Sequence, residues 1–264
     1  MKSLRPLLFF TLILIVVGMA CSLLSGGGDT PSQPVATQEP VQQPPVSNPP
    51  TTAPEPTQVP PTDEPPTSEP QPVLSKYFTE EFDQDPGSNW VADIIGPGAD
   101  QYKDTVKQSF TNSRMRVELP NDDLYFYYTY LGETYDNVRI DLRADNRGVN
   151  TNNISLFCRS TKDGWYEWSV GSGGDWYLYA VTDKYNLIAN GGTNLLKQGK
   201  EVNEYSMICK DNKISMFVNG KEIKLSPVTD KKYGLREGTV GFNISSLNVT
   251  PVVVEVDWFK VSEP

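Results

Sequence analysis

Hydrophobic and polar residues alternate with a period of two through most of the chain after residue 75. The clearest stretch, 137–144, alternates aliphatic and charged side chains: Val138, Ile140 and Leu142 against Arg139, Asp141 and Arg143. Side chains of a β-strand point alternately to its two faces, so this pattern predicts strands with one buried face.

A strong turn signal lies in Lys210–Leu225, KDNKISMFVNGKEIKL. Two alternating stretches flank Asn219 and Gly220, and Asn-Gly suits the positive φ angles of a tight hairpin turn. We therefore predict a hairpin whose second strand runs through Ile223 to Leu225.

Further short strands are predicted between clusters of Gly, Asn and Asp, and no stretch after residue 75 has a sustained helical period. The predicted strands are 76–82, 114–119, 124–130, 137–144, 153–159, 165–170, 176–181, 204–210, 239–244 and 252–261, besides the hairpin. Many short strands of this kind favour an all-β fold, and we predict one two-sheet antiparallel jelly-roll sandwich over residues 74–264.

The first 21 residues have the layout of a bacterial export signal. Lys2 and Arg5 precede an apolar run, and small residues precede Cys21. GMAC at 18–21 resembles a lipobox, although Gly18 stands where the family usually has Leu. The resemblance implies lipid attachment at Cys21. An uncleaved membrane span over residues 7–24 and simple secretion after Ala20 remain as alternatives, and all three place the rest of the chain outside the cytoplasm.

Residues 22–73 have a different composition. Fifteen of the 22 prolines lie between Pro31 and Pro72, among Thr, Ser and Gln, and the charges there are all acidic. Such a segment has too little apolar surface to offset the entropy of ordering. We predict a disordered linker that holds the folded domain away from the membrane.

Charge and composition exclude several functions. The formal net charge of -10 gives no basic field for nucleic acid. The chain has no histidine, which excludes nucleophilic catalysis with an imidazole base and disfavours zinc and iron enzymes.

Three cysteines are present, and Cys21 belongs to the signal. Cys158 and Cys209 lie within predicted strands of a domain exported to an oxidising compartment, so we predict that they form a disulfide. Two buried thiols are the alternative.

Several motifs occur in a familiar order: EEFD at 80–83, LFCRS, GWYEWSV, FVNG, GTVGF and a closing VEVDWFKV. Together these resemble the concanavalin A-like jelly rolls of bacterial surface proteins, in particular laminin G and 3-keto-disaccharide hydrolase-like domains. The resemblance covers roughly residues 74–261. It implies a sandwich with one concave sheet, commonly used to bind glycans and less often to cut them.

The enzymes nearest this fold, family 16 glycoside hydrolases, carry Glu-x-Asp-x-Glu or Glu-x-Asp-x-x-Glu on a strand. Glu255 and Asp257 begin the match, but Phe259 and Lys260 occupy the positions of the second glutamate. Retaining hydrolysis needs two carboxylates about 5 to 5.5 Å apart. We therefore predict that the chain is not an enzyme.

Aromatic residues are the candidate ligand contacts, because sugar rings stack on flat side chains while their hydroxyls bind polar groups. If Tyr166, Trp168 and Val170 fill the core, Trp165 and Glu167 face outward. The candidate ligand-binding residues are Trp165, Glu167, Tyr125, Tyr127 and Trp176. For any single ring, packing in the core is the competing interpretation.

No cofactor is expected, apart from a structural calcium ion as a secondary hypothesis. Glu81, Asp83 and Asp257 lie where the first and last strands of such sandwiches often meet, and carboxylates there can hold the ion.

Together the patterns predict an envelope-anchored lipoprotein that binds glycan or another surface polymer. The alternatives are a structural or protein-interaction domain and a glycoside hydrolase. Ligand identity and oligomeric state do not follow from the sequence.

Overall fold

The computed structural model describes residues 75–148 and 151–264. The predictions for the export signal, the lipid-modified Cys21 and the proline-rich linker lie outside these residues. Within the described part, no helix combines the length and the apolar character needed to cross a bilayer.

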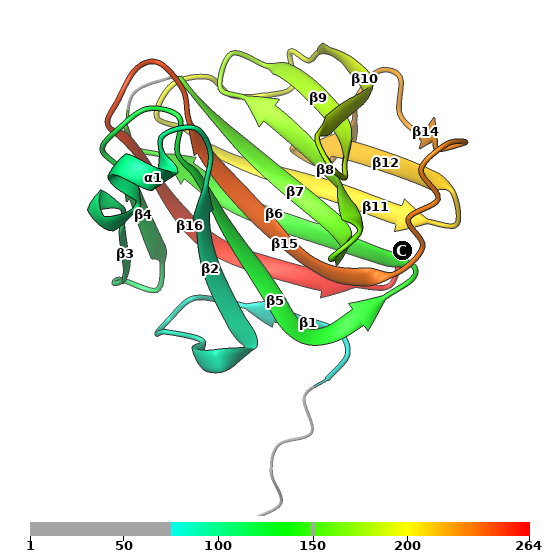
Figure 1. The fold of residues 1–264 in the computed structure, drawn as a ribbon, viewed down its shortest axis with the longest axis horizontal. Coiled ribbons are helices and arrows are strands. Elements are labelled where there is room, and N and C mark those ends of the chain that lie inside the picture. The colour runs from blue at the N-terminus through cyan, green and yellow to red at the C-terminus, as the bar shows by residue number, and fades with distance from the viewer. Residues whose placement is uncertain (1–74, 149–150) are drawn as a thin grey trace, which may run out of the picture. The chain divides into compact units, whose positions relative to one another are not determined.

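The described residues form two antiparallel sheets packed face to face (Figure 1). Sheet A has nine strands: β1 (Phe78–Glu80), β3 (Lys107–Phe110), β4 (Met115–Leu119), β6 (Val138–Asn146), β11 (Val202–Lys210), β12 (Lys213–Val218), β13 (Lys221–Glu222), β14 (Val228–Thr229) and β16 (Val252–Ser262). Sheet B has seven: β2 (Trp90–Ile95), β5 (Tyr125–Tyr135), β7 (Asn152–Thr161), β8 (Gly164–Gly171), β9 (Asp175–Val181), β10 (Tyr185–Gly192) and β15 (Gly238–Ser246). The predicted all-β sandwich is confirmed.

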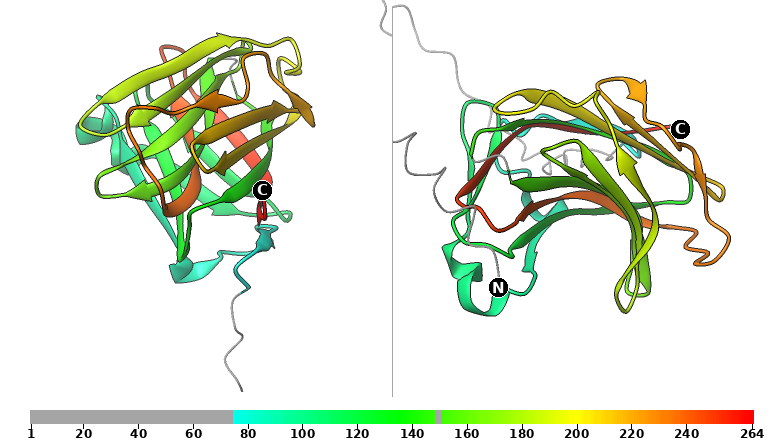
Figure 2. Two further views of the ribbon diagram at one scale, coloured as in Figure 1. Left: turned by 90° about the vertical axis from the view of Figure 1, so that its right-hand side faces the viewer. Right: turned by 90° about the horizontal axis from the view of Figure 1, so that it is seen from above.

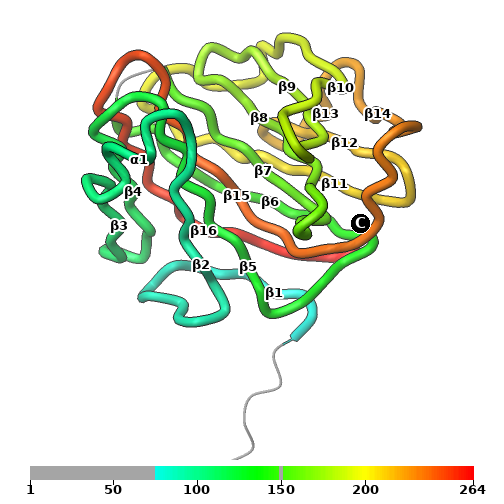
Figure 3. Tube along the Cα trace, viewed as in Figure 1, coloured from blue at the N-terminus to red at the C-terminus, as the bar shows by residue number. Residues whose placement is uncertain are grey.

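The strand order brings distant parts of the chain together. In sheet B the order is β10-β9-β8-β7-β15-β5-β2, so the late strand β15 lies between β7 and β5, as the trace in Figure 3 shows. In sheet A the first strand, β1, pairs with the last, β16. These crossovers make the middle of each sheet a junction of early and late segments.

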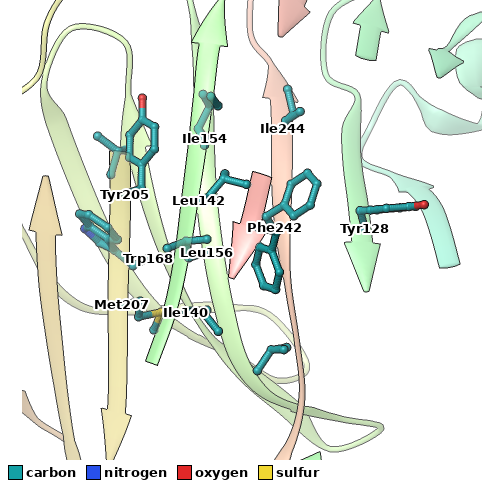
Figure 4. Close-up of a cluster of buried hydrophobic side chains, with 14 of the residues drawn as sticks. Tyr128, Ile140, Leu142, Ile154, Leu156, Trp168, Tyr205, Met207, Phe242 and Ile244 are labelled. Carbon is teal, nitrogen blue, oxygen red and sulfur yellow. The ribbon is translucent and has the colours of Figure 1, made fainter. Parts of the chain in front are cut away.

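The core fills the space between the sheets. Alternate residues of each strand point inward, including Leu142 and Met207 from sheet A and Leu156, Trp168 and Phe242 from sheet B (Figure 4). All five are fully buried. Burial of this apolar surface is the main force that holds the two sheets together.

A disulfide connects the sheets. Cys158 on β7 bonds to Cys209 on β11, with their Cα atoms 6.7 Å apart and both residues buried. The predicted bond is confirmed, and it closes a loop with a sequence separation of 51 residues.

The predicted hairpin forms, but its second strand is shorter than expected. Asn219 and Gly220 have φ angles of 51° and 75°, as the turn requires. The prediction of a strand through Leu225 is wrong, because β13 ends at Glu222 and Leu225 has a φ of 71° that a strand cannot contain. Ser226 Oγ instead accepts a hydrogen bond from Met216 N of β12, at 2.9 Å.

Helical structure among the described residues is limited to one turn, α1 (Ala99–Tyr102), and two 3-10 turns, η1 (Gly87–Asn89) and η2 (Lys103–Thr105). Sheet B arches, and its outer face is concave (Figure 2, right). That face holds the candidate site.

Candidate functional site

Outward-facing side chains of neighbouring strands line up in rows across the concave face of sheet B. One row contains Tyr179, Glu167, Phe157, Gly241 and Thr129, and the next contains Tyr177, Ser169, Ser155, Asn243, Tyr127 and Asp93. In the second row the middle strands carry small polar residues, with a tyrosine on either side, whereas in the first row the ring of Phe157 lies between Glu167 and Gly241. The concave face therefore combines polar side chains with aromatic rings.

A steric constraint explains why position 241 is a glycine. The ring of Phe157 lies over Gly241, and a Cβ at that position would come within 2.5 Å of the ring. The absence of a side chain on β15 thus leaves room for large rings above the middle of the sheet.

Glu167 is the central carboxylate of this face. It is 3 % exposed, and its Oε2 accepts hydrogen bonds from Tyr127 Oη at 2.6 Å and from Trp165 Nε1 at 2.9 Å. Burial raises the pKa of Glu167 above its usual range, and the two hydrogen bonds offset only part of that rise.

Tyr127 and Tyr185 meet above the floor. Tyr127 comes from β5 and Tyr185 from β10 at the opposite edge of the sheet, and their hydroxyl oxygens are 2.5 Å apart. Burial raises the pKa of both phenols, and the carboxylate of Glu167 raises both further. Tyr127, Tyr185 and Glu167 form one hydrogen-bonded group, which we call the tyrosine bridge.

Two hollows flank Tyr127. The first, of about 180 Å³, is lined by Tyr125, Asn153, Glu167, Ser169, Tyr179, Tyr185, Ser245 and Leu247. The second, of about 160 Å³, is lined by Asp93, Ile95, Tyr127, Thr129, Phe157, Ser160 and Trp165. Each hollow combines aromatic rings with hydroxyl, amide or carboxylate groups.

Four of the five predicted ligand-binding residues come together here. Tyr125 and Glu167 line the first hollow, Trp165 and Tyr127 the second. Tyr125 and Trp165 are half-buried, whereas Tyr127 is 6 % exposed because its ring packs against other rings of the face.

Trp176 has a different place. Its side chain is fully buried in the core, so it does not reach the concave surface. The reason is the register with β8: Trp176 pairs with the buried Val170 and so lies on the inward face, and Gly191 on β10 leaves room for the indole. The inward residues of β9 are therefore Trp176, Leu178 and Ala180.

The opposite face of β9 supplies residues that we did not predict. Tyr177 and Tyr179 project outward as a stacked pair, with ring centroids 6.0 Å apart, and Tyr185 contacts Tyr179 edge-on. The segment DWYLY at 175–179 is rich in aromatic residues, but its alternation alone fits either phase.

Glu255 and Asp257 lie on the other sheet, on the outer face of β16. Asp257 pairs with Arg114 at 3.4 Å and with Arg143 at 2.8 Å, and Glu255 pairs with Arg116 at 2.9 Å. The partial Glu-x-Asp motif therefore belongs to a surface ion-pair network away from both hollows.

The residues suggested for calcium do not converge. Glu81 and Asp83 are exposed in the segment after β1, while Asp257 is paired with arginines. Across the described part of the chain, no three or more acidic, cysteine or histidine side chains gather as metal ligands.

Comparison with known proteins gives matches at the level of structure. No protein family matches the sequence, and no curated protein is similar to it. A Bacillus subtilis protein of unknown function with a galectin-like fold superposes with a TM-score of 0.56 and 14% identity, over 70% of this chain and 94% of that one. The chain has a concanavalin A-like jelly roll.

Two glucanases extend this comparison. A Bacillus licheniformis β-glucanase matches with a TM-score of 0.53 and 16% identity, over 71% of this chain and 98% of its own. A family 16 endo-glucanase from Bacteroides ovatus matches with a TM-score of 0.53 and 10% identity, over 70% and 99%. At these identities the likeness establishes the fold, and function has to be argued from the concave face itself.

Proposed function

We propose that the chain is an envelope-anchored, extracytoplasmic protein whose concave face binds glycan without catalysis. The observation that carries the proposal is the pair of hollows beside Tyr127, each lined by aromatic rings and polar groups. Solved structures of the same fold include glucanases, which supports a glycan ligand for this face.

The hollows offer the two kinds of contact that a sugar needs. Rings of Tyr125, Tyr179 and Trp165 can stack against the apolar C–H faces of a pyranose. Hydroxyl groups of the same sugar can bond to Asn153 and to the carboxylate of Glu167.

The distribution of carboxylates supports binding without hydrolysis. Each described strand of sheet B carries at most one acidic residue, and β7, β10 and β15 carry none. Each hollow is lined by one carboxylate, Glu167 in the first and Asp93 in the second. Retaining and inverting glycosidases both need a cooperating pair.

Two separate features of the chain support a location outside the cytoplasm. The N-terminal segment has the residue pattern of an export signal before Cys21, and a proline-rich segment follows. The disulfide between Cys158 and Cys209 fits a compartment in which thiols oxidise. We propose attachment through a lipid on Cys21.

A glycan array probed with the purified full-length chain tests the proposal. We expect binding to at least one polysaccharide, and Tyr179→Ala should weaken it more than tenfold. Tyr233→Ala is the matched control, since Tyr233 is a partly buried tyrosine that lines neither hollow. Absence of binding to every polysaccharide would favour a protein-interaction domain, and release of sugars from a bound polymer would identify a glycosidase.

A further inference from the structure

The charges around the two hollows all have one sign. Glu167 lines the first and Asp93 the second, and none of the fifteen lining residues is a lysine or an arginine. Lys184 precedes Tyr185 in the turn before β10, but it is exposed and lines neither hollow.

The arginines of sheet A form ion pairs of their own. Arg114, Arg116, Arg143 and Arg147 lie on the outer face of sheet A, where each pairs with a carboxylate of that same face. They therefore cannot neutralise an anionic ligand on the concave face of sheet B.

An anionic group in either hollow would meet a carboxylate and no compensating cation. Beside ionised Glu167 the repulsion would be poorly screened, because that side chain is 3 % exposed. A neutral sugar meets no such repulsion. The hydroxyls of the sugar can donate hydrogen bonds to Oε1 of Glu167, because the hydrogen bonds from Tyr127 and Trp165 both go to Oε2.

We infer that the concave face selects uncharged glycan chains and rejects polymers that carry carboxylate, sulfate or phosphate groups. This inference rests on the proposed glycan-binding function and adds its ligand class. It separates this chain from proteins that recognise the anionic polymers of a cell envelope through lysine and arginine.

Pairs of polymers that share a backbone test the inference with the full-length chain. Suitable pairs are hydroxyethyl and carboxymethyl cellulose, dextran and dextran sulfate, and inulin and carboxymethyl inulin, together with the charged derivative of any polysaccharide that binds in the array. We expect the neutral member to bind at least tenfold more tightly, and the preference to persist in 0.5 M NaCl, where long-range repulsion is screened within about 5 Å.

Charge variants distinguish the hollows from the net charge of the chain. Asp93→Lys and Asn153→Lys each place a cation in one hollow and should reduce the preference at least fivefold. Glu263→Lys makes the same change in charge as Asp93→Lys at an exposed position after β16, and it should leave the preference unchanged.

The outcomes distinguish a failure of the inference from a failure of the proposed glycan-binding function. Equal or tighter binding of the charged member by the unmodified chain overturns the inference and leaves glycan binding in place. An equal effect of Glu263→Lys and Asp93→Lys also overturns it, because net charge would then explain the preference. Binding to no polymer at all overturns the glycan-binding function itself.

Discussion

Tyr127 and Glu167, separated by two intervening strands of sheet B, share a buried hydrogen bond of 2.6 Å from the phenol to the carboxylate. This bond fixes the Tyr127 ring between the two hollows. Tyr127→Phe should lower the free energy of unfolding by about 1–3 kcal/mol, because a buried carboxylate loses a donor. Tyr125→Phe removes a phenol from the same strand and should change stability by less than about 0.5 kcal/mol.

Urea denaturation of both variants measures this difference. Equal stability of Tyr127→Phe and the unmodified chain would show that Trp165 and solvent satisfy Glu167 without the phenol.

Glu167 also predicts a dependence of stability on pH. Its pKa is raised in the folded chain, so the folded state binds more protons than the unfolded state between the ordinary and the raised pKa. The free energy of unfolding should therefore decrease as pH rises through that window and stay level above it. Glu167→Gln should remove this decrease and keep an acceptor for Tyr127 and Trp165. Denaturation from pH 4 to pH 8 compares the two chains, and parallel curves would contradict the prediction.

The disulfide should contribute a large share of the stability of the sandwich. Closing a loop of 51 residues corresponds to about 4 kcal/mol in the loop-entropy estimate. Cys158→Ala with Cys209→Ala should lose about that amount in denaturant unfolding. Reduction of the unmodified chain with a phosphine is the control, since it breaks the bond without altering core volume. A loss below about 1 kcal/mol in both experiments would show that inter-sheet packing alone sets the stability.

The sequence predicted the architecture because most core strands place alternate residues inward over several positions. In β6, Val138, Ile140 and Leu142 are all buried, as their alternation with charged residues indicated. Trp165 and Glu167 were assigned to the outer face by the same rule applied to β8. Alternation within single strands therefore carries enough information to predict the two-sheet fold.

Parts of the site depend on contacts with neighbouring strands, and the sequence of a single strand does not specify those contacts. Trp176 lies inward and Tyr177 outward because of the register of β9 with β8, and the indole fits only because Gly191 on β10 has no side chain. The strand β10 was itself not predicted. Its sequence, YNLIANGG, has no regular alternation and contains a bulge between Leu187 and Ala189. Tyr185 reaches Tyr127 only because sheet B arches, which no local pattern encodes.

Asp257 should be a structural ion-pair residue with no role in metal binding. Its partners Arg114 and Arg143 each have a second carboxylate nearby, Glu255 and Glu204, so Asp257→Asn should cost less than about 1 kcal/mol. Glycan binding should be unchanged, because β16 lies in the other sheet. Thermal unfolding with calcium or with EDTA should give the same midpoint. A calcium-dependent rise that Asp257→Asn abolishes would instead restore the calcium hypothesis.

The mode of attachment can be decided at Cys21. If a lipid on that residue anchors the chain, Cys21→Ala should move the protein from the membrane fraction to the soluble fraction or block maturation of the precursor. Ser22→Ala, one residue later, is the control and should stay in the membrane with its lipid. Fractionation combined with the mass of the N-terminal peptide gives the readout. If the Cys21→Ala variant remains membrane-bound with residues 7–24 intact, the N-terminal segment is an uncleaved membrane span. If the unmodified chain is cleaved after Ala20 and carries no lipid, the protein is simply secreted.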